Sequence, residues 1–423
     1  MTRQTSGKGR LFAEPRPGSD EATFQIDNTS DAYYASPYYQ AHKNDLQPIH
    51  PPRLTPSRMN LSDVLDAAAI SAIVKRNRIA FHAAGDMGAA KRDDPSTEAS
   101  VADMMVADVS GGGGAAPSFL FHLGDVVYNF GEAKYYYDQF YEPLRAYDRP
   151  IFAVPGNHDG MVFGATSDRP ANTTLEAFLR NFCAPSPTRS PDAGTLVRST
   201  MTQPGIYFCL DAPFVSIIGL YSNVLDGPGV ISSQGGHYPI SDEQLAFLIS
   251  ELTRLKPQRA AGKRAVIIAI HHPPLSADAK HGGSSGASAD IDACCTKAGL
   301  WPDAVLSGHA HLYQRFTRRI GGREIPYVVS GSGGFAATAP QQRLPKAPVT
   351  VGDHTLEKDP IVAFGYLTVT ADPGFLTIEF KSSQKGVAGD SVVVDLKKGT
   401  LKQEASAGAG RAHAKAKHRP VKR

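Results

Sequence analysis

Side chains that bind metal ions follow five short apolar runs in this sequence. The five polar segments are GDMG (85–88), GDVVY (124–128), GNHD (156–159), IAIHHPP (268–274) and GHAH (308–311). Asp, Asn and Tyr offer oxygen atoms and His offers nitrogen, a mixture of donors that suits iron, manganese or zinc. Glycine beside these residues lets the backbone and a metal approach each other closely. We therefore expect a metal centre assembled from segments far apart in the chain.

The apolar runs that lead into these segments are expected to be buried strands. They read RIAFHAAG, SFLFHLG, PIFAVPG, AVIIAIH and DAVLSG, and each ends in Gly, His or Pro. A short continuous apolar run is typical of a strand covered on both faces. Binding residues of α/β sheets gather at the carboxyl ends of the strands. The polar segments should therefore converge at one edge of the fold.

Two hairpins and two helices complete the predicted pattern. Residues 205–223 and 362–383 read as hairpins, the second turning at Asp372–Gly374. Residues 61–77 have helical spacing, and 241–255 form an amphipathic helix with a capping box of Ser241 and Gln244. Strand–helix units mixed with antiparallel hairpins favour an α/β fold of two mixed β-sheets with helices outside.

Taken in order, the five segments resemble the signature of the calcineurin-like metallophosphoesterase superfamily, in its purple acid phosphatase branch. That signature reads DxG, GDxxY, GNH(D/E), VxxH and GHxH, and the likeness spans residues 78–335. Ile268 stands where the signature has Val. The resemblance implies the metallophosphoesterase fold, a four-layer α/β sandwich of two mixed β-sheets flanked by helices.

The resemblance also implies a site for two metal ions. The seven ligands it carries over are Asp86, Asp125, Tyr128, Asn157, His271, His309 and His311. Asp125 would bridge the metals. The first metal would also be bound by Asp86, Tyr128 and His311, and the second by Asn157, His271 and His309.

Tyr128 distinguishes this branch from its relatives. Many relatives carry a metal-binding His where this chain has Gly88, and here the Tyr128 phenolate would supply the missing donor. A hard phenolate implies Fe(III) at the first site, with Fe(II), Zn or Mn at the second. The alternative is an ordinary core tyrosine, beside the Tyr135–Tyr137 run.

The activity implied is hydrolysis of small phosphate esters, of the acid phosphatase type. A metal-bridging hydroxide would attack phosphorus in line without a covalent intermediate, so that catalysis rests on positioning and charge stabilisation. His158, held by Asp159, is one candidate acid for the leaving group. His281, ten residues after His271, is the other.

Three other histidines are expected to have structural roles. His272 follows a predicted ligand and should only pack against it or support it. His82 and His122 lie within apolar strands, where a buried histidine with satisfied hydrogen bonds is the more common case.

Two other functions stay open at this point. A phosphodiesterase or nucleotidase would use the same site, because substrate choice lies in loops such as 160–202 and 275–298. A non-catalytic phosphate-binding protein is the third reading. The complete set of predicted ligands argues against it.

Charge is unevenly distributed along the 423 residues. The chain has 44 Lys and Arg against 41 Asp and Glu, a formal net charge of +3. Residues 397–423 hold nine of the basic residues and one acid, Glu404, so residues 1–396 carry 35 basic and 40 acidic side chains. The body is therefore slightly acidic, and its charge gives no reason to expect a nucleic-acid enzyme.

We expect an irregular, partly disordered arm over residues 1–60, a catalytic domain over 61–398 and a disordered basic tail over 399–423. The tail could contact nucleic acid or an anionic surface, or serve only solubility. The sequence contains no run of about 18 apolar residues and therefore predicts no membrane span. An N-terminus without an apolar segment and four scattered cysteines favour the cytoplasm.

Overall fold

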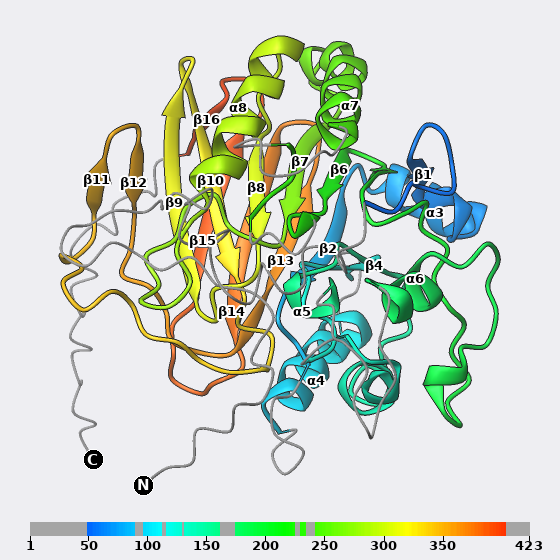
Figure 1. Cartoon of the computed structure of the whole chain (residues 1–423). Coiled ribbons are helices and arrows are strands. Elements are labelled where there is room, and N and C mark those ends of the chain that lie inside the picture. The colour runs from blue at the N-terminus through cyan, green and yellow to red at the C-terminus, as the bar shows by residue number, and fades with distance from the viewer. Residues whose placement is uncertain are drawn as a thin grey trace, which may run out of the picture.

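Two mixed β-sheets form the centre of the fold (Figure 1). The computed structural model describes residues 49–88, 96–111, 116–128, 131–160, 174–224, 229–233 and 242–402. Most of the predicted N-terminal arm (1–48) and most of the basic tail (403–423) lie outside these ranges.

The seven-stranded sheet has the order β16-β15-β14-β13-β2-β3-β4. Strands β2, β3 and β4 are parallel to one another, and the other pairs are antiparallel. The strands are β2 (Ile79–Ala84), β3 (Leu120–His122), β4 (Ile151–Ala153), β13 (Gly365–Ala371), β14 (Phe375–Ser382), β15 (Asp390–Asp395) and β16 (Thr400–Leu401).

The nine-stranded sheet has the order β1-β5-β6-β7-β8-β10-β9-β12-β11. Strands β6, β7, β8 and β10 are parallel, and β9 returns antiparallel to β10. The strands are β1 (Arg58–Asn60), β5 (Phe208–Ala212), β6 (Val215–Leu220), β7 (Ala265–Ile270), β8 (Ala304–Ser307), β9 (Tyr313–Ile320), β10 (Arg323–Ser330), β11 (Val349–Val351) and β12 (His354–Leu356).

Helices cover the outer face of each sheet. The α-helices are α3 (Ala67–Lys75), α4 (Ser96–Gly111), α5 (Asn157–Gly160), α6 (Glu176–Phe182), α7 (Glu243–Ala260) and α8 (Ser285–Ala298). Short 3₁₀ turns span η1 (Leu61–Asp63), η3 (Ala133–Tyr135) and η5 (Pro191–Ala193), and η4 (Tyr137–Tyr141) is a π-helical turn.

Three apolar cores separate four layers. One core lies between the sheets and includes Phe81 and Ile267. A second joins Leu252 of α7 and Ile291 of α8 to the nine-stranded sheet, and a third joins α4 and α6 to the seven-stranded sheet. All residues of β2 and β7 are buried, as expected for strands covered on both faces. The predicted α/β architecture of two mixed sheets flanked by helices is confirmed (Figure 1).

The smaller elements follow the sequence with some corrections. Both predicted hairpins are present, as β5–β6 and β13–β14. The first predicted helix begins only at Ala67, because the side chain of Asp66 accepts the Ala69 N–H at 2.7 Å and caps it there. Among the described helices, none is long and apolar enough to cross a membrane.

The expected capping box of α7 falls partly outside the described residues. Ser241 lies there, and the Gln244 side chain instead pairs with the backbone N–H and C=O of Tyr221. At the predicted domain boundaries, residues 58–60 of the arm form β1, which pairs with β5. Residues 400–401 of the tail form β16, which pairs with β15.

Candidate metal centre

The five predicted polar segments meet at the carboxyl ends of strands from both sheets. Asp86, Asp125 and Asn157 follow β2, β3 and β4, which pair in register in one sheet. His271 and His309 follow β7 and β8, which are neighbours in the other sheet. All five side chains are buried. The site therefore lies where the strand ends of the two packed sheets face each other.

Asp86 is the centre of the first group of predicted ligands. Its Oδ1 accepts a hydrogen bond from the Tyr128 hydroxyl at 3.1 Å and lies 3.4 Å from Nε2 of His311. Its Oδ2 accepts the backbone N–H of His309 at 2.7 Å. Tyr128 and His311, which are far apart in the sequence, thus meet at one carboxylate.

Asp125 stands between this group and the second. Its Oδ1 accepts the backbone N–H of His158 at 2.8 Å, and its Oδ2 lies 3.4 Å from Nε2 of His271. Potential ligand atoms of Asp86, Asp125 and His271 all lie within 4.8 Å of one another. Asp125 is therefore well placed to serve two neighbouring positions.

The ring of His271 is oriented by its backbone neighbour. Its Nδ1 donates to the Leu123 carbonyl at 2.8 Å, which leaves Nε2 facing Asp125 and Oδ1 of Asn157, 3.0 Å away. A histidine that donates one ring N–H to a carbonyl presents its other nitrogen as a ligand.

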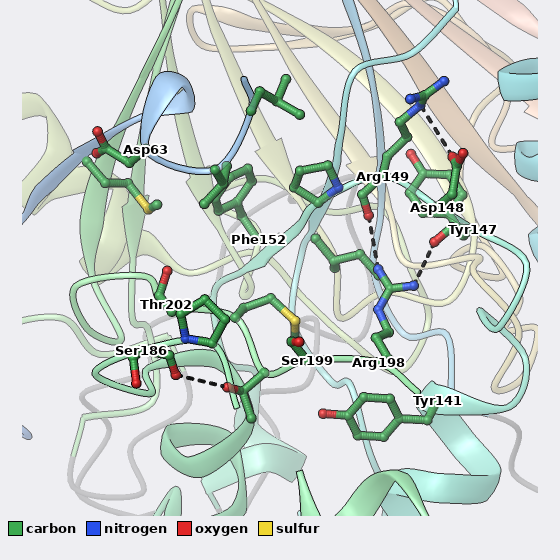
Figure 2. Close-up of a pocket in the computed structure, with 18 of the residues that line it drawn as sticks. Asp63, Tyr141, Tyr147, Asp148, Arg149, Phe152, Ser186, Arg198, Ser199 and Thr202 are labelled. Carbon is green, nitrogen blue, oxygen red and sulfur yellow. Dashed lines mark hydrogen bonds and ion pairs between the residues drawn. The ribbon is translucent and has the colours of Figure 1, made fainter. Parts of the chain in front are cut away.

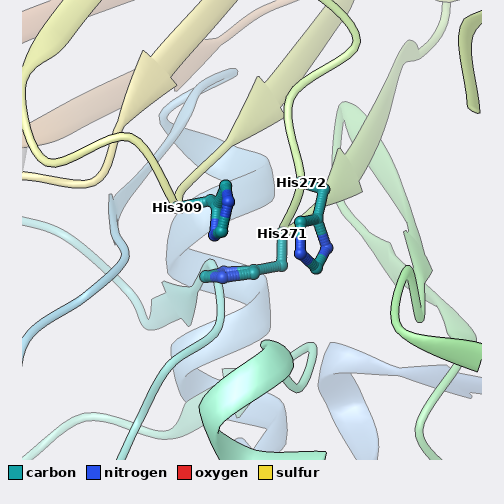
Figure 3. A group of neighbouring side chains, drawn as sticks. All are labelled: His271, His272 and His309. Carbon is teal, nitrogen blue, oxygen red and sulfur yellow. The ribbon is translucent and has the colours of Figure 1, made fainter. Parts of the chain in front are cut away.

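Three imidazoles form a further group, in which His272 joins His271 and His309 (Figure 3). Potential ligand atoms of the three lie within 4.8 Å of one another. The ring centroids of His272 and His309 are 4.3 Å apart, and Nδ1 of His272 lies 2.9 Å from Oγ of Ser222. The sequence favoured only a supporting role for His272. In a strand, neighbouring side chains point to opposite faces. His271 and His272 follow the end of β7 at Ile270, so this alternation does not apply to them.

Buried polar atoms and glycines at this place fit bound cations. Among the described residues, neither Oδ2 of Asp125 nor Nε2 of His309 has a hydrogen-bond partner, although both are buried. An unpartnered buried polar atom is costly, and a metal ion would give both atoms a partner. A Cβ atom on Gly156 would collide with the Asp125 carboxylate, and one on Gly308 would lie 2.7 Å from Oδ2 of Asp86. The backbone thus approaches both carboxylates as closely as glycine permits.

The charges of the site are set by burial and by near neighbours. Burial lowers the pKa of His309 well below its ordinary value, and the nearby His272 and His281 lower it further. Burial also lowers the pKa of His271, but the Asp125 carboxylate outweighs this and raises it to about 9. Burial alone would raise the pKa of Asp125. His271 and His158 instead hold it below its usual range. His309 is therefore a neutral nitrogen donor, and Asp125 an ionised oxygen donor.

Tyr128 is fixed by residues that the sequence did not single out. Its backbone N–H donates to Oε1 of Gln139 at 2.8 Å, and Nε2 of Gln139 donates back to the Tyr128 carbonyl at 3.1 Å. A Cβ atom on Gly88 would lie 2.7 Å from Oε1 of Gln139 and 3.3 Å from the Tyr128 ring. A side chain at position 88 would therefore collide with Gln139, which holds the backbone of Tyr128, and would crowd the Tyr128 ring.

His158 lies beside Tyr128, and the carboxylate of Asp159 binds the backbone of two loops at the site. The ring centroids of His158 and Tyr128 lie 4.4 Å apart. Both carboxylate oxygens of Asp159 accept backbone N–H groups, from Gly156, Val126 and Val127 at 2.8 to 3.2 Å. Burial raises the pKa of Asp159 to about 7, and the charge of Asp125 adds to the effect. Asp159 therefore holds the loop after β3 against the loop after β4.

His281 also lies at the site, on the side of His309 and His311. Its ring centroid is 4.7 Å from that of His309 and 4.9 Å from that of His311. Oδ1 of Asp278 accepts the backbone N–H of His281 at 2.7 Å and lies 3.5 Å from its Nδ1. The sequence reasoning missed Asp278, although an Asp that binds backbone two and three residues on is a common turn signal.

The two strand histidines differ from each other. His82 is satisfied as predicted, with the Tyr147 hydroxyl 3.1 Å from Nδ1 and Oδ2 of Asp108 3.3 Å from Nε2. His122 accepts the Gly124 N–H at Nδ1, but its buried Nε2 has no hydrogen-bond partner among the described residues. His122 is therefore buried as predicted, but only one of its ring nitrogens has its hydrogen bond satisfied. Burial lowers its pKa to about 3, which keeps the ring neutral.

Comparison with known proteins finds one matching family model and solved structures of similar fold. Residues 106–313 match the family model of the calcineurin-like phosphoesterases. No curated protein sequence matches the chain. A purple acid phosphatase from yellow lupin (Lupinus luteus) seeds has a TM-score of 0.52 and 16% identity, over 75% of this chain and 54% of its own. GAP50 of Plasmodium, described as the anchor in the inner membrane complex, has a TM-score of 0.51 and 14% identity, over 76% of this chain and 91% of its own. The chain thus spans about half the length of the lupin enzyme, and both likenesses are of fold.

Proposed function

We propose that the chain, whose residues 106–313 match the family model of the calcineurin-like phosphoesterases, is a dinuclear metal-dependent hydrolase of phosphate esters, of the acid phosphatase type. The observation that carries the proposal is the position of Asp125. This buried carboxylate lies beside His271, and its Oδ2 has no hydrogen-bond partner among the described residues.

The residues would hold two metals as follows. Asp86, Asp125, Tyr128 and His311 would bind one ion, and Asp125, Asn157, His271 and His309 the other. The phenolate of Tyr128 favours Fe(III) at the first position, and the nitrogen donors suit Fe(II), Zn or Mn at the second. When bound, the two ions would polarise the phosphoryl oxygens and lower the pKa of the water that attacks phosphorus.

The other polar side chains would position the ester and its protons. His281, held through its backbone by Asp278, is the candidate to protonate the leaving group. His158 lies beside Tyr128 and would contact a phosphoryl oxygen. Asp159 is a positioning residue, since it keeps the loops that carry Asp125 and Asn157 together.

The fold alone does not entail hydrolysis, because one protein of this fold is described as an anchor. The argument for catalysis is that acid, amide, phenol and imidazole donors all gather at one buried place. We therefore expect a small phosphate ester as substrate. Monoester, diester and nucleotide substrates are distinguished by the experiment below.

The test combines metal analysis with a substrate panel. We expect two metals per chain after reconstitution with iron and zinc, and hydrolysis of an aryl phosphate. Asn157→Ala and His309→Ala should each lower the rate about 100-fold or more without unfolding the chain. His354→Ala, a half-buried histidine on β12 outside the centre, is the matched control and should keep the rate. A chain that retains no metal after reconstitution would refute the site. Faster cleavage of diesters or nucleotides than of monoesters would reassign the substrate class.

A further inference from the structure

A pocket of about 930 Å³, drawn in Figure 2, lies outside the candidate metal centre. It is bordered by the segments 53–65, 141–152 and 185–202, and includes none of the candidate metal ligands. Pro150 and Phe152 line it at the start of β4, whereas Asn157 follows the end of that strand. Its volume falls in the range of pockets that hold small molecules.

Apolar side chains line this pocket, and three of them are exposed. Phe152 and Met59 line it with almost fully buried side chains. Leu54, Val64 and Val197 also line it and are 41%, 38% and 96% exposed. They are three of the six exposed large hydrophobic residues in the described part of the chain. Clustered exposed apolar side chains mark a place where a ligand or partner binds.

The same pocket carries an excess of positive charge. Two acidic residues, Asp63 and Asp148, line it together with four arginines, which are Arg53, Arg145, Arg149 and Arg198. Among the described residues, Nε of Arg149 has no hydrogen-bond partner, and it lies 3.4 Å from a carboxylate oxygen of Asp148, whose side chain is 68% exposed. This guanidinium is therefore only weakly neutralised by the protein itself.

Arg198 is a rigid cation in this pocket. Its guanidinium donates to the backbone carbonyls of Leu144, Tyr147 and Arg149 at 3.3, 2.6 and 3.0 Å. Figure 2 shows it bridging the carbonyls of Tyr147 and Arg149. Because all three acceptors are neutral carbonyl groups, they fix the guanidinium of Arg198 in place but do not neutralise its charge. A fixed cation beside apolar side chains favours an anion with an apolar body.

We propose that this pocket binds a small amphipathic anion, with one acidic group on an aromatic or aliphatic body. The acidic group would lie at Arg198, and the body would cover Phe152, Met59 and Val197. The site is separate from the metal centre, so the proposal stands whether or not the chain hydrolyses phosphate esters.

The test uses two dyes with nearly the same apolar body. Anilinonaphthalene sulfonate carries a negative charge, and N-phenyl-1-naphthylamine is neutral. We expect saturable fluorescence titration of the full chain with the sulfonate. Arg198→Gln should raise its Kd about tenfold or more and leave the Kd of the neutral dye unchanged. Val197→Asp should weaken both dyes. Arg76→Gln and Val74→Asp, exposed positions on and beside α3, are the matched controls and should bind both dyes like the wild type.

Several outcomes would overturn the proposal. They are the absence of saturable binding, an unchanged Kd for the sulfonate in Arg198→Gln, and an equal loss of both dyes in that variant. A second copy of the chain is the other possible occupant. Light scattering that shows a dimer dissociated by Val197→Asp would assign the pocket to that interface instead. Thermal unfolding of each variant checks that the fold is retained.

Discussion

The phenol ring of Tyr128 stacks on the ring of Phe335, with centroids 3.5 Å apart and planes within 5° of parallel. The Tyr128 hydroxyl is directed at Oδ1 of Asp86, 3.1 Å away. Phe335 follows β10, and its backbone N–H donates to the Asp86 carbonyl at 2.9 Å. The loop that carries Phe335 therefore holds both Asp86 and the face of Tyr128, and so aims the phenol oxygen at the predicted first metal.

Removing that oxygen tests the iron assignment. Tyr128→Phe keeps the ring and its stack on Phe335, so the melting temperature should change little. The iron-loaded wild type should show a visible tyrosinate-to-iron absorption band, and the variant should lose it. Phe335→Leu is the companion variant and should keep a band, because the phenol oxygen remains. A Tyr128→Phe protein that keeps its colour would contradict the assignment of Fe(III) to this residue.

Gly88 tests the space that Tyr128 occupies. A Cβ atom there would press on Gln139 and on the Val126 carbonyl at 2.7 and 2.9 Å. We expect Gly88→Ala to cost about 1–3 kcal/mol in the free energy of unfolding and to weaken the visible band. Gly111→Ala at the end of α4, where a Cβ would meet nothing within 4 Å, is the control and should not destabilise the chain. Equal effects of the two substitutions in denaturant unfolding would show that no close packing exists at Gly88.

Leaving-group dependence separates the two candidate acids. A poor leaving group such as an alkoxide needs a proton, whereas 2,4-dinitrophenolate does not. His281→Ala should therefore slow an alkyl phosphate about 100-fold and 2,4-dinitrophenyl phosphate far less. His158→Ala should slow both substrates alike. The opposite pattern in steady-state kinetics would transfer the role of acid to His158.

The stability of the chain should depend on pH through His82. Burial lowers the pKa of His82 in the folded chain, although Asp108 opposes this. As pH falls below about 6.5, the unfolded chain takes up the proton first, so folding loses stability toward acid. His82→Phe should cost about 1–3 kcal/mol at pH 8, because Tyr147 and Asp108 lose a partner. The gap between variant and wild type should narrow at pH 5. A gap in urea unfolding that stays constant or widens toward acid would contradict this account.

Much of the fold was predictable because its strands are local patterns. Apolar runs such as 79–84 and 265–270 can be recognised as strands without knowledge of tertiary contacts. The turn at Asp372–Gly374 is stabilised by a hydrogen bond between its own residues. The start of α3 was missed because a single cap, Asp66, decides it. The pairing of Gln244 could not be predicted for a different reason. Its partner Tyr221 is far away in the sequence, and no local pattern indicates this hydrogen bond.

The sequence by itself determined which chemistry is available to this protein. Five polar segments, each placed after a strand, supply carboxylates, an amide, a phenol and imidazoles in an order that resembles one family. Only the tertiary structure decided how these groups face each other. The backbone bonds of Asp159, the stack of Phe335 on Tyr128 and the approach of His272 to His309 all join residues from different strand ends. Such contacts depend on which strands are neighbours and on how the two sheets pack, and no local pattern in the chain encodes either.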